Sequence, residues 1–398
     1  MPALDGLRIL DMTQYEAGPS CTQSLAWLGA DVVKIEATNY GDPGRVLQGD
    51  GSGYAPYFCN WNANKRSVSL DLRKPEGRDL LLRLLPRFDI FVENYGPGAV
   101  DRLKLAYEDL RPVHPRLIYA QVKGFGLSGP YSDYKSYDAV AQAAAGAFSV
   151  TGEPDGPPVR PGFTVGDSGT GTQLATAILA AVIQRDRTGE GQHIELSMQE
   201  AITYYMRTVM SFDSQWGTQA SARTGNSMGA PPIGLYPCKP GGPNDWVFMM
   251  TVTGRHWDAF CLALERQDLV VDPRFETDVA RVENADALYE EISNWTQARS
   301  KHEVMAILGA AGVPCSATLD TKDLHEDPHL VARGFVQKVD LPQHGPVRML
   351  GFPTRMSASD VPIRPAPLLG EHTDQVLGEE LSLSGDELAA LRESGVVR

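Results

Sequence analysis

The sequence predicts an α/β protein built on a parallel, Rossmann-like sheet. Short apolar runs alternate with longer stretches in which apolar residues recur at helical spacing, and this alternation is typical of parallel strands joined by helices. The chain has 398 residues, of which 42% are hydrophobic. That length and composition can bury a large core and suggest two domains, or one domain with an insertion. We therefore expect a large Rossmann-like domain and a smaller α/β domain.

The expected elements of the large domain follow one another as strand and helix. Residues 7–10 and 32–35, on either side of a helical stretch at 19–28, are mainly apolar and predict two short buried strands. Further strands are expected at residues 90–92, 117–122 and 194–196, and further helices at 75–85, 138–148 and 172–183. This repeated order implies a parallel sheet.

The composition changes at residues 211–242, which are rich in Gly, Pro, Ser and Thr and lack apolar periodicity. Such a segment predicts a linker or an active-site loop. Beyond it, a strand is expected at residues 247–252, and helices at 257–264, 285–297 and 302–311. These elements predict the smaller α/β domain.

The charge of the chain limits its partners. A formal net charge of −14 argues against non-specific binding to nucleic acid or to anionic lipid. No apolar run approaches the roughly 20 residues that span a bilayer, and Met1–Asp5 does not resemble a signal peptide. We therefore expect a cytoplasmic protein. The five cysteines are scattered without a CxxC pair, so we expect reduced, buried thiols.

One acidic residue stands at the head of a strong helical pattern. Asp167 lies in the glycine-rich segment Gly166–Gly171, directly before the apolar-periodic stretch Thr172–Ile183. Unpaired N–H groups at a helix start favour an ionised carboxylate, and the glycines would let a ligand approach the backbone. Asp167 is thus a candidate nucleophile. Local sequence alone favours a simpler alternative, in which Asp167 or Ser168 caps the helix.

The chain also carries an ordered series of short motifs. They are Leu4–Asp11, Ala17–Pro19, Leu28–Glu36, Asn64–Ser67, Leu70–Leu72, Val92–Gly98, Lys123–Gly126, Arg223–Asn226 and Leu368–Thr373. In this order they resemble the family III CoA-transferases, a group that includes formyl-CoA:oxalate and carnitine CoA-transferases and the α-methylacyl-CoA racemases. The set runs from one terminus nearly to the other.

The resemblance implies an architecture and an activity. The large domain would be built from both chain ends, and two chains would interlock into a homodimer. We expect the first part of the large domain at residues 1–205, a linker at 206–225, the small domain at 226–325, and the return linker with the rest of the large domain at 326–398. The implied activity moves CoA from an acyl-CoA thioester to a small carboxylic acid of the formyl, oxalate or succinyl type. Coenzyme A enters as a substrate, and neither a permanent cofactor nor a metal is expected.

The resemblance also assigns site residues. Asp167 becomes the nucleophile, which passes through an aspartyl anhydride and an aspartyl-CoA thioester. Contact with substrate or CoA carries over to Glu16, Ala17, Asn94, Tyr95, Arg102, Lys135, Tyr137, Asp138, Met198 and Gly225. Arg102 and Lys135 are matched to CoA phosphates, although a lone Arg or Lys is usually a surface charge. Gly225 or Gly229 could donate an N–H to the tetrahedral oxyanion.

Three positions depart from patterns in the family. Glu16 stands where formyl-CoA transferases have a glutamine that contacts the bound carboxyl group, and a carboxylate there would repel an anion unless protonated or paired. Ala37 and Thr38 stand where the family has a basic residue, so the adenine end of CoA would be held less tightly or by other residues. Tyr137 replaces a racemase histidine, and tyrosine, with a pKa near 10, is a poor base for an α-proton.

Other functions are weighed against the transferase. A nicotinamide dehydrogenase would use Glu36 on the ribose, but the turn Asp11–Pro19 lacks the G-x-G-x-x-G pattern. A zinc hydrolase would use His325–His329, which matches H-E-x-x-H, but Pro328 would interrupt the required helix. A 2-methylacyl-CoA racemase and a non-catalytic CoA-binding protein with a silent Asp167 stay open as alternatives.

Overall fold

The computed structural model describes residues 1–48, 54–342 and 344–398. The chain forms two compact units. The first unit comprises residues 1–149, 160–221 and 331–398, and the second comprises 150–159 and 222–330. Residues 150–159, which the sequence prediction included in the span 1–205, belong to the second unit.

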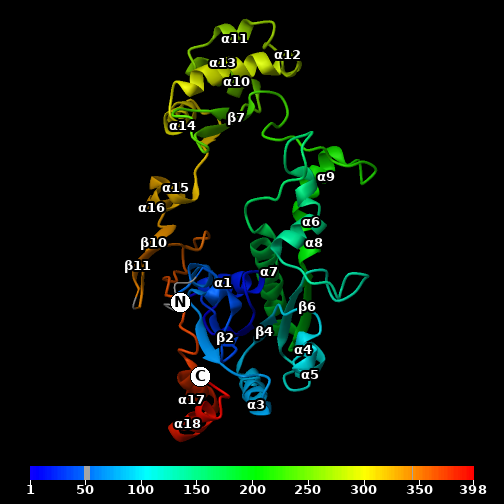
Figure 1. Ribbon diagram of the computed structural model, residues 1–398, viewed down its shortest axis with the longest axis vertical. Coiled ribbons are helices and arrows are strands. Elements are labelled where there is room, and N and C mark those ends of the chain that lie inside the picture. Colours follow the sequence, from blue (N-terminus) through cyan, green and yellow to red (C-terminus); the bar gives the residue numbers. More distant parts are fainter. Residues whose placement is uncertain (49–53, 343) are drawn as a thin grey trace. The chain divides into compact units, whose positions relative to one another are not determined.

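A six-stranded parallel sheet forms the centre of the first unit (Figure 1). Its strands are β1 (Arg8–Met12), β2 (Asp31–Glu36), β3 (Arg66–Ser69), β4 (Ile90–Glu93), β5 (Ile118–Lys123) and β6 (Gln192–Ser197). They lie in the order β3-β2-β1-β4-β5-β6, which is the order of a doubly wound Rossmann sheet. The predicted α/β class with a parallel sheet is confirmed. Strand β3 was missed because its residues, Arg-Ser-Val-Ser, are mostly polar.

Two apolar layers cover the two faces of the sheet. Ile9 and Ile90 pack on one face with α1 (Ala17–Trp27) and α7 (Val165–Thr188). Leu10 and Phe91, the next residues along each strand, pack on the other face with α3 (Pro75–Leu84), α17 (Thr373–Leu381) and α18 (Gly385–Glu393). Both faces are therefore buried, which explains why the central strands are almost continuously apolar.

The remaining elements of the first unit are shorter. They are η1 (Pro43–Val46), α2 (Pro56–Asn62), η2 (Leu85–Arg87), α4 (Ala99–Arg102), α5 (Tyr107–Leu110), α6 (Asp138–Ala144), η3 (Ala147–Val150), α8 (Met198–Tyr205), α9 (Arg207–Asp213), β10 (Val336–Leu341) and β11 (Gly345–Leu350). The last two strands pair as an antiparallel hairpin.

The outer edge of β3 is covered by the segment that precedes and begins α17. The N–H of Ser69 donates to Thr373 Oγ1 at 3.0 Å, and the N–H of His372 donates to Ser67 O at 2.9 Å. Leu70, just beyond the strand, forms a β-bridge with Val397. This edge of the sheet is therefore paired rather than left open.

The second unit has its own sheet and its own core. The antiparallel sheet consists of β7 (Ile233–Pro237), β8 (Trp246–Met250) and β9 (Cys315–Ala317). Its helices are α10 (Gly254–Ala263), α11 (Asp268–Val271), α12 (Asp278–Glu283), α13 (Ala285–Gln297), α14 (Lys301–Ala310) and α15 (Thr321–Glu326), and α16 (Pro328–Ala332) follows at its boundary. Phe260, Ile292 and Val304 are fully buried in the core of this unit.

Candidate active site

The strand order of the large sheet reverses between β1 and β4, where Met12 lies opposite Glu93. In doubly wound sheets, ligands bind outside the carboxyl ends of the strands at this point. A pocket of about 260 Å³ is lined by residues that follow β1, β4, β5 and β6, together with the start of α7. The predicted site residues that line it are Ala17, Asn94, Tyr95, Lys135, Tyr137, Asp167 and Met198.

Asp167 is the third residue of α7. The helix begins at Val165, and Thr164 precedes it. The main-chain N–H of Asp167 bonds to Thr164 O and to Asp138 Oδ1, each at 3.2 Å. The hydroxyl of Ser168 donates to Thr164 O instead of accepting from a helical N–H. The alternative in which Asp167 or Ser168 caps the helix is therefore wrong, and the Asp167 side chain lines the pocket.

Two glycines of the segment Gly166–Gly171 leave room for neighbouring helices to pack closely. A Cβ atom at Gly166 would lie 2.6 Å from Asp138 Oδ1, and one at Gly171 would lie 2.1 Å from Ser20 Oγ. The expectation that these glycines give a ligand access to the backbone is therefore wrong for both positions. Instead, they let α6 and α1 approach α7 closely. That approach brings Asp138, and Glu16 at the head of α1, to the start of α7.

The Asp167 carboxyl group lies in an unfavourable environment for a negative charge. Burial raises its pKa to about 8, and the carboxylates of Glu16 and Asp138 add to the rise. Burial also raises the pKa of Glu16 to about 7, although the hydrogen bond from Thr164 Oγ1, at 2.6 Å, opposes the increase. These effects oppose the ionised state that was expected for Asp167, because burial and like charges act against the field of the helix start.

A network of polar contacts holds the loop after β1 against this site. Asn94 pins Gln14 with two hydrogen bonds, accepting from its N–H at 2.7 Å and donating to its carbonyl at 2.8 Å. The N–H of Tyr15 donates to Asp42 Oδ1 at 3.1 Å, and Asp42 forms a buried ion pair with Lys34 at 2.9 Å. Sequence reasoning missed Asp42 and Lys34. The available signal was a lysine inside an otherwise apolar strand.

The walls and the rim of the pocket differ in exposure. Ala17 and Met198 are buried, whereas Lys135 is exposed and Tyr137 is 63% exposed. The ring of Tyr137 meets the ring of Tyr15 edge to face, with 5.8 Å between centroids. The pocket thus has a buried apolar wall and an aromatic, basic rim.

Arg102 lies in a separate hollow of about 650 Å³. Tyr95 lines this hollow and also the pocket that contains Asp167. The other cations that line it, missed from the sequence, are Arg73, Lys74, Arg78 and Lys104. Arg73 is paired with Asp71, and Arg78 donates to main-chain carbonyls. The hollow is therefore strongly basic on a chain whose net charge is −14.

Gly225 belongs to the second unit. Its N–H donates to the carbonyl of Gly152 at 3.1 Å. A Cβ atom at this position would lie 2.6 Å from the Glu153 carboxylate, and its φ of +58° favours glycine. In this arrangement the N–H of Gly225 is engaged with the Gly152 carbonyl, and donation from Gly225 or Gly229 to an oxyanion stays a prediction.

The residues that a nicotinamide dehydrogenase or a zinc hydrolase would use are not placed for those functions. Glu36 is buried and its carboxylate accepts from Arg45 at 2.7 Å and from Ser67 at 2.6 Å, so it is not open to a ribose. His325 lies in α15 and His329 in α16, on either side of a helix break. Within the described ranges, no cluster of three His, Cys, Asp or Glu residues is arranged to hold a metal. No helix in the same ranges has the length and hydropathy to cross a membrane.

The cysteine side chains do not suit nucleophilic chemistry. Cys21, Cys59, Cys238 and Cys261 are buried free thiols, as expected, and Cys315 is partly buried. Burial raises the pKa of Cys59 to about 11 and that of Cys261 to about 12. Thiols in such surroundings stay protonated near neutral pH.

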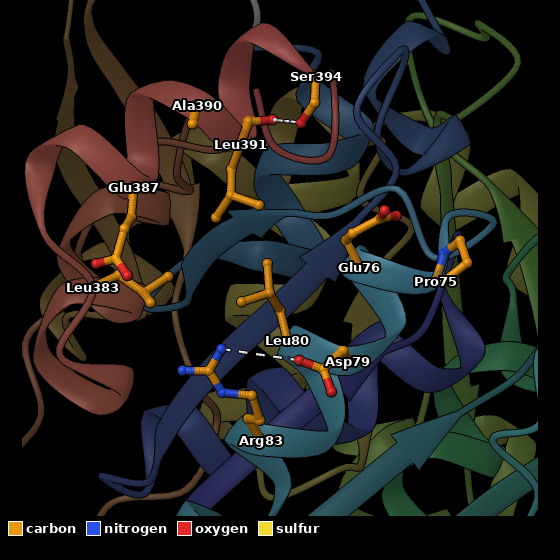
Figure 2. A pocket seen from close by; sticks show the side chains of 10 residues that line it. All are labelled: Pro75, Glu76, Asp79, Leu80, Arg83, Leu383, Glu387, Ala390, Leu391 and Ser394. Atoms are coloured by element: carbon orange, nitrogen blue, oxygen red, sulfur yellow. Dashed lines mark hydrogen bonds and ion pairs between the residues drawn. The ribbon is translucent and has the colours of Figure 1, made fainter.

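A further hollow of about 600 Å³ lies between α3 and α18 (Figure 2). Leu80 and Leu391 face it from the two helices, and Arg83 lies 3.9 Å from Asp79 along α3. Its lining contains carboxylates and leucines but no His, Cys or Lys. The pocket at the strand ends, which combines a perturbed carboxyl group with a basic rim, is the stronger candidate for chemistry.

Comparisons with known proteins show the family of this chain. Residues 4–373 match CoA-transferase family III. The chain belongs to this family. Formyl-CoA:oxalate CoA-transferases from Streptomyces coelicolor and from Rhodopseudomonas palustris strain BisA53 are 40% and 38% identical to it, over 99% of this chain and 99% and 97% of theirs.

Solved structures show the same relationship. A CaiB/BaiF family protein from Brucella suis superposes with a TM-score of 0.85 at 32% identity, covering 95% of this chain and 99% of its own. Rv3272 from M. tuberculosis superposes with a TM-score of 0.80 at 27% identity, covering 94% and 98%. This member of CoA-transferase family III thus shares its architecture along nearly the whole chain.

Proposed function

We propose that this chain transfers CoA from an acyl-CoA thioester to a small free carboxylic acid, with Asp167 as the covalent nucleophile. One observation carries the proposal. Among the described residues that line the pocket at the strand ends, Asp167 is the one carboxylate. It stands at the start of a long helix that is fixed by contacts with α1 and α6. A carboxylate so placed suits nucleophilic catalysis on a thioester.

The proposed reaction consists of four exchanges at acyl carbons. The ionised Asp167 attacks the thioester carbonyl, and the CoA thiolate leaves to give a mixed anhydride. The thiolate then attacks the aspartyl carbon, which releases the donor acid and leaves an aspartyl-CoA thioester. The acceptor carboxylate attacks this thioester and expels the thiolate again. Finally, the thiolate attacks the acceptor carbonyl, which forms the new acyl-CoA and frees Asp167.

The two hollows that share Tyr95 support the orientation of CoA. The basic hollow that contains Arg102 would take the phosphates, which need local cations on an acidic protein. The pocket with Asp167 would take the thioester end, and Lys135 lies exposed on its rim. We also propose a homodimer, which the family resemblance implies, and a cytoplasmic location, which the composition favours.

The family also includes racemases, which need a base on each side of the α-carbon. Within the described lining of the pocket there is no histidine, and Tyr137 occupies the rim. The names of the 40% identical relatives, which refer to formyl-CoA and oxalate, support transfer between small acids. The racemase and the non-catalytic alternatives therefore have less support than the transferase.

The test is to trap the covalent intermediate. Wild-type protein incubated with an acyl-CoA and then with hydroxylamine should carry a hydroxamate at Asp167, detected by peptide mass spectrometry. Asp167→Asn should give no hydroxamate and no transfer, because the amide cannot attack the thioester. Asp186→Asn, an exposed change on the same helix, serves as the matched control and should behave like wild type. Full turnover by a folded Asp167→Asn protein would refute the proposal.

A further inference from the structure

Three carboxyl groups lie near one another at the start of α7, and Asp167 is the one that lines the pocket. Glu16 precedes α1, Asp138 begins α6, and Asp167 lies in the first turn of α7. Asp138 Oδ1 accepts the N–H of Asp167 at 3.2 Å, and Glu16 Oε1 accepts the hydroxyl of Thr164 at 2.6 Å. Glu16 is only 2% exposed and Asp138 is 8% exposed. Hydrogen bonds from residues at the start of α7 thus hold the carboxyl groups of Glu16 and Asp138 in place.

Among the described residues, the carboxyl groups of Glu16 and Asp138 accept hydrogen bonds from Thr164, from Gln142 and from the N–H of Asp167, which carry no positive charge. From α2, the phenol of Tyr57 faces both Glu16 and Asp167, and burial raises the pKa of that phenol, so it stays neutral. In the described part of the chain, no Lys or Arg is among the groups that shift the pKa of Asp167 or of Glu16. The reactive end is therefore acidic, whereas the hollow with Arg102 is basic.

One of the two lysines that line the pocket already bonds to other groups. Lys123 lines the same pocket, but its Nζ donates to Tyr95 O at 2.6 Å and pairs with Glu93 at 2.8 Å. Lys135 is exposed on the rim. Neither lysine is among the groups that shift the pKa of Asp167.

This distribution of charge discriminates between acceptor acids. The reacting carboxylate of an acceptor loses its charge when it becomes part of an anhydride. A second carboxylate on the same small molecule would keep its charge and stay close to Glu16 and Asp138. Like charges at short range inside a protein cost binding energy. Acids with a single carboxylate avoid this repulsion.

We infer that the acceptor is a monocarboxylic acid without a second negative charge, and that Glu16 enforces this choice through its charge. The inference rests on the proposed transferase function and narrows its substrate class. Glu16 does not line the pocket, so it is a positioning residue that acts through the field at Asp167.

Two variants separate the charge of Glu16 from its hydrogen bond. Glu16→Gln keeps the size of the side chain and an oxygen that accepts from Thr164, but it removes the charge. Thr164→Val removes the hydrogen bond, and it keeps the charge when the assay is run at about pH 9, well above the Glu16 pKa of about 7. Only the first variant should change the preference between acceptors.

The experiment measures kcat/KM for the CoA ester formed from propionate, oxalate and succinate, with one fixed acyl-CoA donor. Wild-type protein should prefer propionate by at least about tenfold, which is about 1.4 kcal/mol. Glu16→Gln should reduce this ratio by about tenfold and shift the pH profile for propionate to lower pH, whereas Thr164→Val should leave the ratio unchanged.

The possible results distinguish failure of the inference about the acceptor from failure of the proposed transferase function. Equal or better use of a dicarboxylate by wild type, or an unchanged ratio in Glu16→Gln, overturns the inference and leaves the transferase proposal standing. A ratio that Thr164→Val reduces as much as Glu16→Gln does would also overturn it, because the effect would then be structural. Absence of transfer to every acid, together with absence of a hydroxamate at Asp167, would overturn the proposed function and the inference with it.

Discussion

Replacement of Gly171 by alanine tests the close approach of α1 and α7. The added Cβ would lie 2.1 Å from Ser20 Oγ, 2.7 Å from Ala17 O and 2.9 Å from Cys21 N. Two of these atoms belong to the backbone of α1, so a rotamer change cannot relieve the overlap. Overpacking of this kind costs about 3 kcal/mol, and the better helix propensity of alanine returns about 1 kcal/mol. The net expectation is a loss of about 2 kcal/mol.

Thermal unfolding followed by circular dichroism measures this loss. At roughly 2–4 °C per kcal/mol for a domain of this size class, the midpoint of Gly171→Ala should fall by about 4–8 °C. CoA transfer should also fall, because Ala17 lines the pocket and would move with α1. The matched control is Gly378→Ala in α17, where the nearest atom is Leu383 O at 3.8 Å, and it should raise the midpoint slightly. A Gly171→Ala protein as stable and active as this control would refute the close packing of the two helices.

Three further predictions concern charge. Transfer should rise about tenfold between pH 7 and pH 9 and level off above about pH 9, because only about a tenth of Asp167 is ionised at pH 7 when its pKa is about 8; a flat profile for the acylation step would contradict this. The folded-state pKa lies above the ordinary value of 3.8, so the folded state binds the proton more tightly, and stability from this group is full below about pH 4 and is lost as pH rises towards 8. Urea unfolding should show this loss in wild type and a smaller one in Asp167→Asn. Separately, Arg102→Ala should raise KM for the acyl-CoA much more than it lowers kcat, because a phosphate contact is equal in the ground and transition states; steady-state kinetics with an unchanged KM would mean that Arg102 does not contact CoA.

The sheet could be predicted from the sequence because its strands are buried on both faces. Residues 7–10, 32–35 and 90–92 are mainly apolar; the last two ranges lie inside strands of the structure, and the first overlaps β1, which begins at Arg8. Helix α13 was predicted with its observed bounds, because the amphipathic pattern of residues 285–297 is complete within that helix. By contrast, α7 begins at Val165 rather than at Thr172. Packing against α1 and α6 stabilises a glycine-rich turn that propensity alone would not.

The position of the pocket followed from the sequence, but its electrostatics did not. Residues after β1, β4 and β5 were matched to a common site, and the structure brings Ala17, Asn94 and Tyr137 to one pocket with Asp167. The ionisation of Asp167 depends on Glu16 and Asp138, which are distant from it in the sequence. The sequence near Asp167 shows the helix start, but it does not show that Glu16 and Asp138 lie nearby in the fold. The separate place of Arg102, in a hollow shared with four other cations, was also not visible from its local motif.

The pairing of the outer edge of β3 with the C-terminal segment around Thr373 has a consequence for folding during synthesis. This strand is complete after the first 69 residues, yet the hydroxyl that accepts from Ser69 belongs to a residue 304 positions later. During synthesis, the edge of the sheet therefore stays open until the segment around Thr373 has left the ribosome. An open parallel edge is a template for pairing with another chain. Nascent or truncated molecules that lack residues 372–397 should thus depend on chaperones far more than the completed protein does.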